Sequence, residues 1–138
     1  IALPARVESV PALRDFVLNA CQRHGLAGQD LEDLLLVSDE AATNIVLHAY
    51  RKEDDKPTFD CDLEIEAGSL FRIQLRDQGI PFKREEVPGP DIRENMAGRR
   101  RGGFGVYLIK SLMDSVEYHR KGDTNFFVAE KILKKEES

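Results

Sequence analysis

The apolar residues in the segment 34–50 recur at steps of three and four, the spacing of one side of an amphipathic helix. They are Leu34, Val37, Ala41, Ile45 and Ala49. Acidic residues just upstream are typical of a helix's first turn, so the helix is expected to begin near Gly28 or Asp30. The sequence therefore predicts a long helix that ends at about Tyr50.

A second segment with the same spacing precedes it. The apolar residues between positions 7 and 20 predict an earlier helix, with Ser9 as its N-terminal cap. Gly25 is expected to end this helix, because glycine readily adopts the left-handed backbone found there. Residues 1–3 fit the end of a short strand that Pro4 would close.

The period changes from helical to two in the segment 59–65, where apolar and acidic residues alternate. Such alternation predicts a half-buried strand. Residues 71–75 alternate in the same way, and the small residues at 67–69 would turn the chain between the two segments. The sequence therefore predicts an antiparallel hairpin.

The C-terminal third repeats this logic. Residues 106–113 predict a short helix, opened by Gly103 and Gly105. A second hairpin is expected within residues 116–133, with its turn at 121–123. Because one side of each strand is apolar and the other charged, we expect one mixed, mostly antiparallel sheet with the helices packed on one face. This is an α/β (α+β) two-layer sandwich.

Composition and charge narrow the class of protein. At 138 residues the chain fits one domain, with 41% hydrophobic and 33% charged residues, as in an ordinary soluble protein. The net charge of −5 argues against nucleic-acid binding through bulk charge. No apolar run approaches the ~20 residues of a membrane span, and no signal peptide is visible, so a cytoplasmic protein is expected. Cys21 and Cys61 lie within periodic segments and are expected to be buried thiols.

The first candidate site lies on the long predicted helix. Glu40 and Asn44 are four residues apart, so they lie one above the other at the flank of the apolar stripe, with His48 a further turn along. A carboxylate and a carboxamide at the edge of a buried face are costly unless something uses them. The alternative is an ordinary half-buried polar flank.

Two further polar segments follow. Asp77 comes directly after a predicted strand, where its carboxylate can accept a hydrogen bond from an exocyclic amine, and Gly79 would let the backbone approach a flat ring. The alternative is a plain turn. Residues 99–101 are three arginines followed by glycines, which suits an anion site at a helix N-terminus. The alternative there is a flexible basic loop. Residues 82–102, with few apolar side chains, are expected to form a lid.

In order, these segments read E-x-x-x-N, D-x-G-x-P and G-G-F-G, an order that resembles the GHKL (histidine-kinase-like) ATPase superfamily. The sequence is most similar to the bacterial anti-sigma-factor serine/threonine-protein kinases, which carry a Glu-Ala-x-x-Asn-x-x-x-His-x-Tyr box, matched here by residues 40–50. The resemblance implies a Bergerat-type ATP-binding fold and a single histidine-kinase-like ATPase domain over residues 1–138.

The resemblance also implies roles for individual residues. Glu40 would be the general base, and Asn44 would coordinate Mg²⁺ on the ATP phosphates. Asp77 would bind the adenine amino group, with Gly79 beside the ring. The remaining implied nucleotide-binding residues are His48, Arg101, Gly103, Phe104, Gly105, Val106 and Thr124. For His48, a structural role on a packed helix is the alternative.

The function implied by the resemblance is that of an anti-sigma factor with ATP-dependent serine/threonine kinase activity, which phosphorylates an anti-sigma-factor antagonist protein on serine. Its partners would be a sigma factor, that antagonist and a second copy of the chain, with no direct contact to nucleic acid or membrane. One alternative is a regulatory module that binds nucleotide but transfers nothing. Another is the catalytic domain of a sensor histidine kinase, whose dimerisation helices with a phosphoacceptor histidine do not fit upstream of Asp30.

Overall fold

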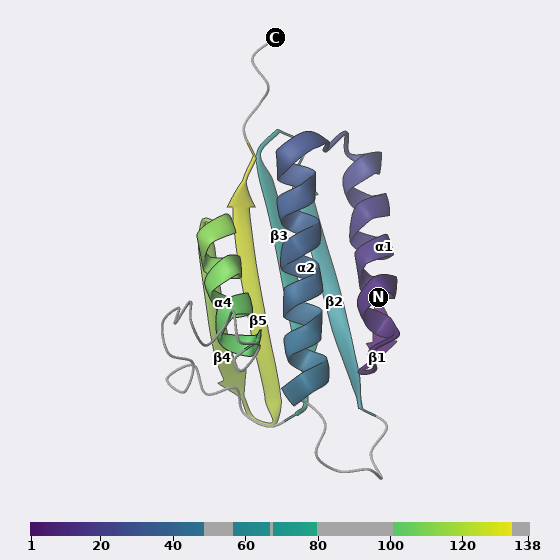
Figure 1. The fold of residues 1–138 in the computed structure, drawn as a ribbon, viewed down its shortest axis with the longest axis vertical. Helices are drawn as coiled ribbons and strands as arrows, with labels where there is room; N and C mark the ends of the chain where they lie inside the picture. Colours follow the sequence, from purple (N-terminus) through teal and green to yellow (C-terminus); the bar gives the residue numbers. More distant parts are fainter. Residues whose placement is uncertain (49–56, 67, 80–100, 134–138) are drawn as a thin grey trace.

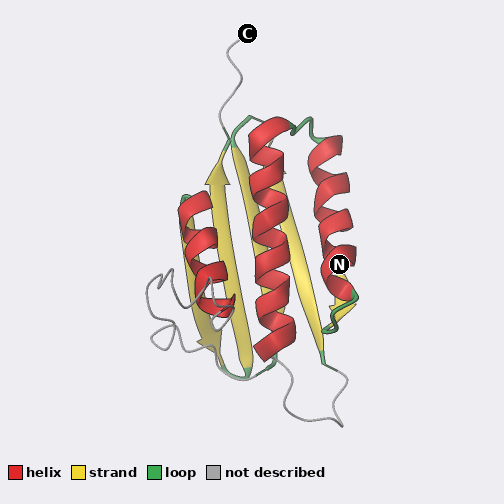
Figure 2. Ribbon diagram, viewed as in Figure 1, coloured by secondary structure: helices red, strands yellow, loops and turns green. Residues whose placement is uncertain are grey.

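One sheet and three helices make up the described part of the chain, which in this computed structural model comprises residues 1–48, 57–66, 68–79 and 101–133. The strands are β1 (Ala2–Pro4), β2 (Thr58–Glu66), β3 (Leu70–Asp77), β4 (Ser115–Lys121) and β5 (Thr124–Ile132). The helices are α1 (Ser9–Arg23), α2 (Gly28–His48) and α4 (Arg101–Leu112). All three helices cover the same face of the sheet, with α2 between α1 and α4 (Figures 1 and 2). The expected two-layer sandwich is confirmed.

The strand order is β1-β2-β3-β5-β4, so the two hairpins β2–β3 and β4–β5 meet through β3 and β5. Both hairpins are as predicted, and Gly68 and Gly122 turn the chain with φ angles of +74° and +64°. All the pairings between described strands are antiparallel, so the parallel part of the expected mixed sheet is not found in these residues. The reason is that β4 returns the chain after α4, which makes β5 antiparallel to β3.

The N-terminal helix differs from its prediction at its start. Ser9 is not the cap, because the helix already includes it and Glu8 occupies the cap position. The Ser9 hydroxyl instead donates a hydrogen bond to the carbonyl oxygen of Pro4, at the end of β1. At the other end the prediction is confirmed, since Gly25 follows α1 with a φ of +78°. The short N-terminal strand is confirmed as β1.

The two other helices bear directly on the candidate site. Helix α2 begins at Gly28, as expected, and is described as far as His48, so the end predicted at Tyr50 lies outside the described residues. Helix α4 begins at Arg101, two residues before the predicted opening glycine Gly103. The predicted lid lies outside the described residues except for positions 101 and 102, which belong to α4.

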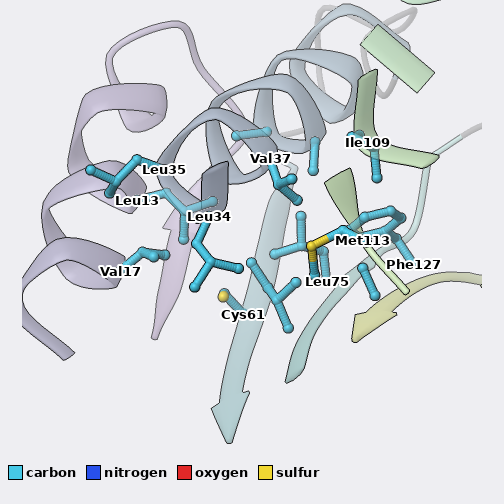
Figure 3. Packing of buried hydrophobic residues seen from close by; sticks show 14 of the residues in the cluster. Leu13, Val17, Leu34, Leu35, Val37, Cys61, Leu75, Ile109, Met113 and Phe127 are labelled. Atoms are coloured by element: carbon cyan, nitrogen blue, oxygen red, sulfur yellow. The ribbon is translucent and has the colours of Figure 1, made fainter. Parts of the chain in front are cut away.

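The core lies between the helices and the inner face of the sheet (Figure 3). Leu34 and Val37 on α2 pack in one cluster with Leu75 on β3, and all three are at most 1% exposed. Cys21 and Cys61 are free and buried in the same cluster, as predicted. Burial raises the pKa of their thiols to about 11 and about 12, so both stay protonated and inert at neutral pH. None of the described helices is long and apolar enough to span a bilayer.

Candidate functional site

The predicted site elements meet at one end of the sheet. Figure 1 shows that the C-terminal end of α2, the end of β3, the start of β5 and the start of α4 lie at the same end of the molecule. This arrangement follows from the strand order, because β3 runs toward that end and the antiparallel β5 starts from it. Residues that are far apart in the sequence are thereby placed on neighbouring elements.

On α2, the two predicted residues lie where their spacing implied. Asn44 is buried, with 7% of its surface exposed, and Glu40 is half-buried one turn earlier. The Asn44 Nδ2 atom is buried and has no hydrogen-bond partner among the described residues. A buried amide group without a partner is destabilising by about 1–3 kcal/mol, which is unusual for an ordinary helix flank. The geometry therefore favours a site in which Asn44 meets a ligand.

The carboxylate of Glu40 is in an environment that favours the protonated form. Its pKa is raised above the usual range for glutamate, first because burial removes water from the charged form, and second because of the negative charge of Asp39. Asp39 itself is held by Arg14 of α1, which donates a hydrogen bond to its Oδ2. A carboxylate with a raised pKa is a stronger base, which suits proton removal from a hydroxyl group.

On the sheet, Asp77 belongs to a row of polar residues that crosses three strands. Asp77 at the end of β3 pairs with Asn125 on β5, and Asn125 pairs with Arg120 on β4. Alternation along β5 puts Asn125 on the same side as the core residues Phe127 and Ala129, which is the helix-covered side. The row therefore lies on the face of the sheet that α2 and α4 cover.

Hydrogen bonds join this row to the Gly79 peptide. The Nδ2 of Asn125 donates to the Asp77 Oδ1 at 3.0 Å, and the Gly79 main-chain N–H donates to the same oxygen at 2.9 Å. Nη1 of Arg120 donates to the Asn125 Oδ1 at 2.9 Å and to the Gly79 carbonyl oxygen at 3.0 Å. The Asp77–Gly79 contact is the side-chain turn expected as the plain alternative, so Asp77 both forms a turn and anchors a network.

Asn125 and Arg120 were not identified from the sequence, although a signal for them exists. Asn125 is in phase with the apolar residues of its strand, and Arg120 is in phase with Val116 and Tyr118. A polar residue in the apolar phase of a strand needs a buried partner. Asn125 is in fact only 9% exposed and finds that partner in Asp77.

The other predicted site residues lie on the same helices and strands, and the structure describes fewer of their side-chain contacts. Thr124 begins β5, and its hydroxyl donates to the Asp123 Oδ1 at 3.1 Å. His48 is the last described residue of α2, and its side chain is outside the described part of the structure. The side chains of residues 101–106 are outside it as well.

The backbone of the glycine-rich segment is helical. Because α4 begins at Arg101, the main-chain N–H groups of residues 101–103 fall in its first turn, where an α-helix leaves them without internal partners. Gly105 and Val106 come after that turn, so their N–H groups have helical acceptors. Of the glycine-rich residues that the resemblance implies, Gly103 therefore has its main-chain N–H in the first turn.

Comparisons with known proteins agree with this arrangement. Residues 3–129 match the family model described as "Histidine kinase-like ATPase domain". The chain is 34% identical to the serine-protein kinase RsbW of Staphylococcus epidermidis over 139 residues, covering 98% of this chain and 86% of that protein. It is 32% identical to the serine-protein kinase RsbW of Staphylococcus aureus strain MSSA476, with the same coverage.

Two solved structures share the fold. The structure of the SiaB–SiaC complex from Pseudomonas aeruginosa superposes with a TM-score of 0.63 at 12% identity, over 96% of this chain and 88% of that one. The histidine kinase domain of a blue-light-activated kinase from Erythrobacter litoralis gives 0.54 at 14% identity, over 94% of this chain and 61% of that one. Because the family model matches residues 3–129, nearly the whole chain, the chain belongs to the histidine kinase-like ATPase domain family.

Proposed function

We propose that this chain is an ATP-dependent protein serine kinase that phosphorylates an anti-sigma-factor antagonist and also binds a sigma factor. The observation that carries the proposal is the pair on α2, a half-buried carboxylate with a raised pKa one turn before a buried amide without a partner. The likeness to proteins named serine-protein kinase over 98% of the chain supports a serine as the acceptor.

Glu40 is the proposed general base. It orients the attacking serine hydroxyl of the partner protein and accepts its proton as the oxygen bonds to the γ-phosphorus. Partial burial supports this role, because a carboxylate shielded from water is more basic and forms stronger hydrogen bonds. In the absence of a protein acceptor, the same carboxylate would orient a water molecule.

Asn44 is the proposed protein ligand for Mg²⁺, through its amide oxygen. The described residues contain no cluster of three or more acidic, histidine or cysteine side chains that could hold a metal. This donor set fits Mg²⁺ bound with a nucleotide, because Mg²⁺ is usually held by one or two protein oxygens together with substrate phosphates and water. When bound, the ion would neutralise charge on the phosphates. The Asn44 atom without a partner among the described residues is its amide nitrogen Nδ2, a donor that would face a phosphate oxygen or a water molecule while the amide oxygen holds the ion.

The strand side is the proposed base site. Asp77 accepts a hydrogen bond from the adenine amino group, Gly79 lies against the ring, and Thr124 at the start of β5 assists from the neighbouring strand. The N–H groups in the first turn of α4, with Gly103 among them, bind phosphate oxygens at the positive end of the helix dipole. His48, Arg101, Phe104, Gly105 and Val106 complete the proposed nucleotide contacts.

The test is phosphoryl transfer to a protein. The chain is incubated with Mg²⁺, γ-labelled ATP and the candidate antagonist proteins encoded near its gene, and the labelled residue is located by mass spectrometry. We expect label on one serine of one antagonist, and none on that antagonist when the serine is replaced by alanine. Binding of the sigma factor and formation of a homodimer are measured on the same sample by analytical ultracentrifugation.

The two outcomes that contradict the proposal differ from each other. Binding of Mg-ATP without transfer to any antagonist would make the chain a nucleotide-binding regulatory module. Failure to bind ATP at all would overturn the nucleotide site itself, and with it both the kinase and the module.

A further inference from the structure

The two carboxylate oxygens of Asp77 differ in how the protein uses them. Oδ1 accepts two hydrogen bonds, from the Gly79 main-chain N–H at 2.9 Å and from the Asn125 Nδ2 at 3.0 Å. Within the described residues, no hydrogen bond involves Oδ2. Because each carboxylate oxygen offers about two acceptor sites, Oδ1 is saturated and a ligand meets only Oδ2.

Arg120 and Asp77 together determine the orientation of the Asn125 amide. A guanidinium group can only donate hydrogen bonds and a carboxylate can only accept them. The amide between them must therefore turn its oxygen toward Arg120, at 2.9 Å, and its NH₂ group toward Asp77. Because Asn125 is only 9% exposed, the flipped amide would leave buried groups without partners, so one orientation is strongly favoured.

The same two side chains hold the peptide group that follows the strand. The Gly79 carbonyl oxygen accepts hydrogen bonds from Arg120 Nη1 at 3.0 Å and from Asn125 Nδ2 at 3.3 Å. Nε of Arg120 donates to the Gly122 carbonyl oxygen at 3.1 Å, which ties the network to the β4–β5 turn. The position of Gly79 and the orientation of Asp77 are thus set before any ligand binds.

We propose that Asn125 and Arg120 are positioning residues that make the base site select adenine over guanine. The inference rests on the proposed ATP site at Asp77. Adenine offers one exocyclic amine, which a single free carboxylate oxygen can accept. Guanine offers an N1–H and an N2 amine side by side, a pair that suits a carboxylate with both oxygens free. Asn125 occupies Oδ1 and so blocks that two-point contact.

The test compares the affinities of ATP and GTP in the presence of Mg²⁺. Dissociation constants are measured by calorimetry for the full chain and for Asn125→Leu, which removes the donor to Oδ1. We expect ATP affinity to fall about tenfold while GTP affinity does not fall, so that the selectivity ratio shrinks about tenfold or more. The control is Asn19→Leu, the same substitution at an exposed position of α1, which should keep the wild-type ratio.

Arg120 is tested separately, because it acts through Asn125. Arg120→Gln should lower the selectivity ratio by about threefold, less than the loss of Asn125, since the amide still donates to Asp77 but loses the arginine that holds its oxygen. The matched control is Lys121→Gln, which removes the same charge from the next residue of the strand. If Asn125→Leu does not fold, Asn125→Val provides the same comparison, because valine also lacks a donor and its branched side chain suits a strand.

The outcomes separate this inference from the proposed function. If the wild type binds ATP but the selectivity ratio is unchanged in Asn125→Leu or Asn125→Val, the positioning role of Asn125 is wrong and the ATP site stands. If the wild type binds ATP and GTP with equal affinity, the proposed selectivity for adenine is contradicted and the proposed nucleotide binding stands. If the wild type binds neither, the proposed site and this inference are both overturned.

Discussion

The pair on α2 and the row across the sheet use similar side chains in opposite ways. Asn44 is buried with an amide nitrogen that has no partner among the described residues, whereas Asn125, equally buried, bonds through both ends of its amide. The row is therefore complete without a ligand, while the pair on the helix is incomplete. A complete network suits the binding of a rigid flat base in one pose. An incomplete one suits groups that change partners during a reaction.

The largest expected effect is on the rate of phosphoryl transfer, when Glu40 on α2 is replaced. Glu40→Gln keeps the shape and most of the helix propensity but removes the proposed general base, so phosphoryl transfer to the antagonist should fall about 10²–10⁴-fold while ATP affinity persists. Single-turnover transfer and calorimetry on the same preparation measure the two quantities. Transfer at the wild-type rate would reduce Glu40 to a structural flank.

The next largest expected effect is on the free energy of unfolding, when Asn125 in the polar row of the sheet is replaced. Asn125→Leu leaves Asp77 and Arg120 without their shared partner, so the free energy of unfolding should drop by about 1–3 kcal/mol. Urea unfolding of the nucleotide-free protein measures it. An unchanged midpoint would show that the row contributes little to the fold, and would contradict the picture of a network that is complete without ligand.

Substitution of leucine for asparagine on the helix should change the free energy of unfolding in the opposite direction. Asn44→Leu replaces a buried amide that lacks a partner, so it should raise the free energy of unfolding by about 1 kcal/mol while abolishing Mg²⁺-dependent ATP binding. The two asparagine variants are compared in the same urea series. Destabilisation by Asn44→Leu would mean that the amide has a structural partner after all.

The smallest effect concerns pH. Because the pKa of Glu40 is raised in the folded state, the fold holds this proton more tightly than the unfolded chain does. Ionised Glu40 therefore destabilises the fold as the pH rises from the usual glutamate pKa through the raised value, and the loss is complete above it. Glu40→Gln should gain stability relative to the wild type over that interval. Tm measured at a series of pH values tests this, with Glu32→Gln, at an exposed position of the same helix, as the matched variant.

The fold and the helix side of the site could be predicted because their signals are local. Helical spacing places Glu40 and Asn44 on one flank, and alternation gives both hairpins. The pairing of β3 with β5 is not local, since it depends on how the two hairpins pack together. The role of Asn125 can be recognised only from this pairing, which places it opposite Asp77. Helix α4 starts earlier than glycine content alone predicts, because the first turn of a helix tolerates glycine. Predicting that these elements meet at one end of the sheet would also have required the strand order.

The pairing of β3 with β5 also has a consequence for the order of folding. Asp77 and Asn125 are 48 residues apart in sequence, so their contact closes a long loop and cannot form before the two hairpins have joined. Glu40 and Asn44 lie one above the other on the same flank as soon as one helical turn forms. A nucleotide that touches both sides of the site would bind only chains in which β3 and β5 have paired, so ATP would shift the folding equilibrium toward that paired sheet by mass action.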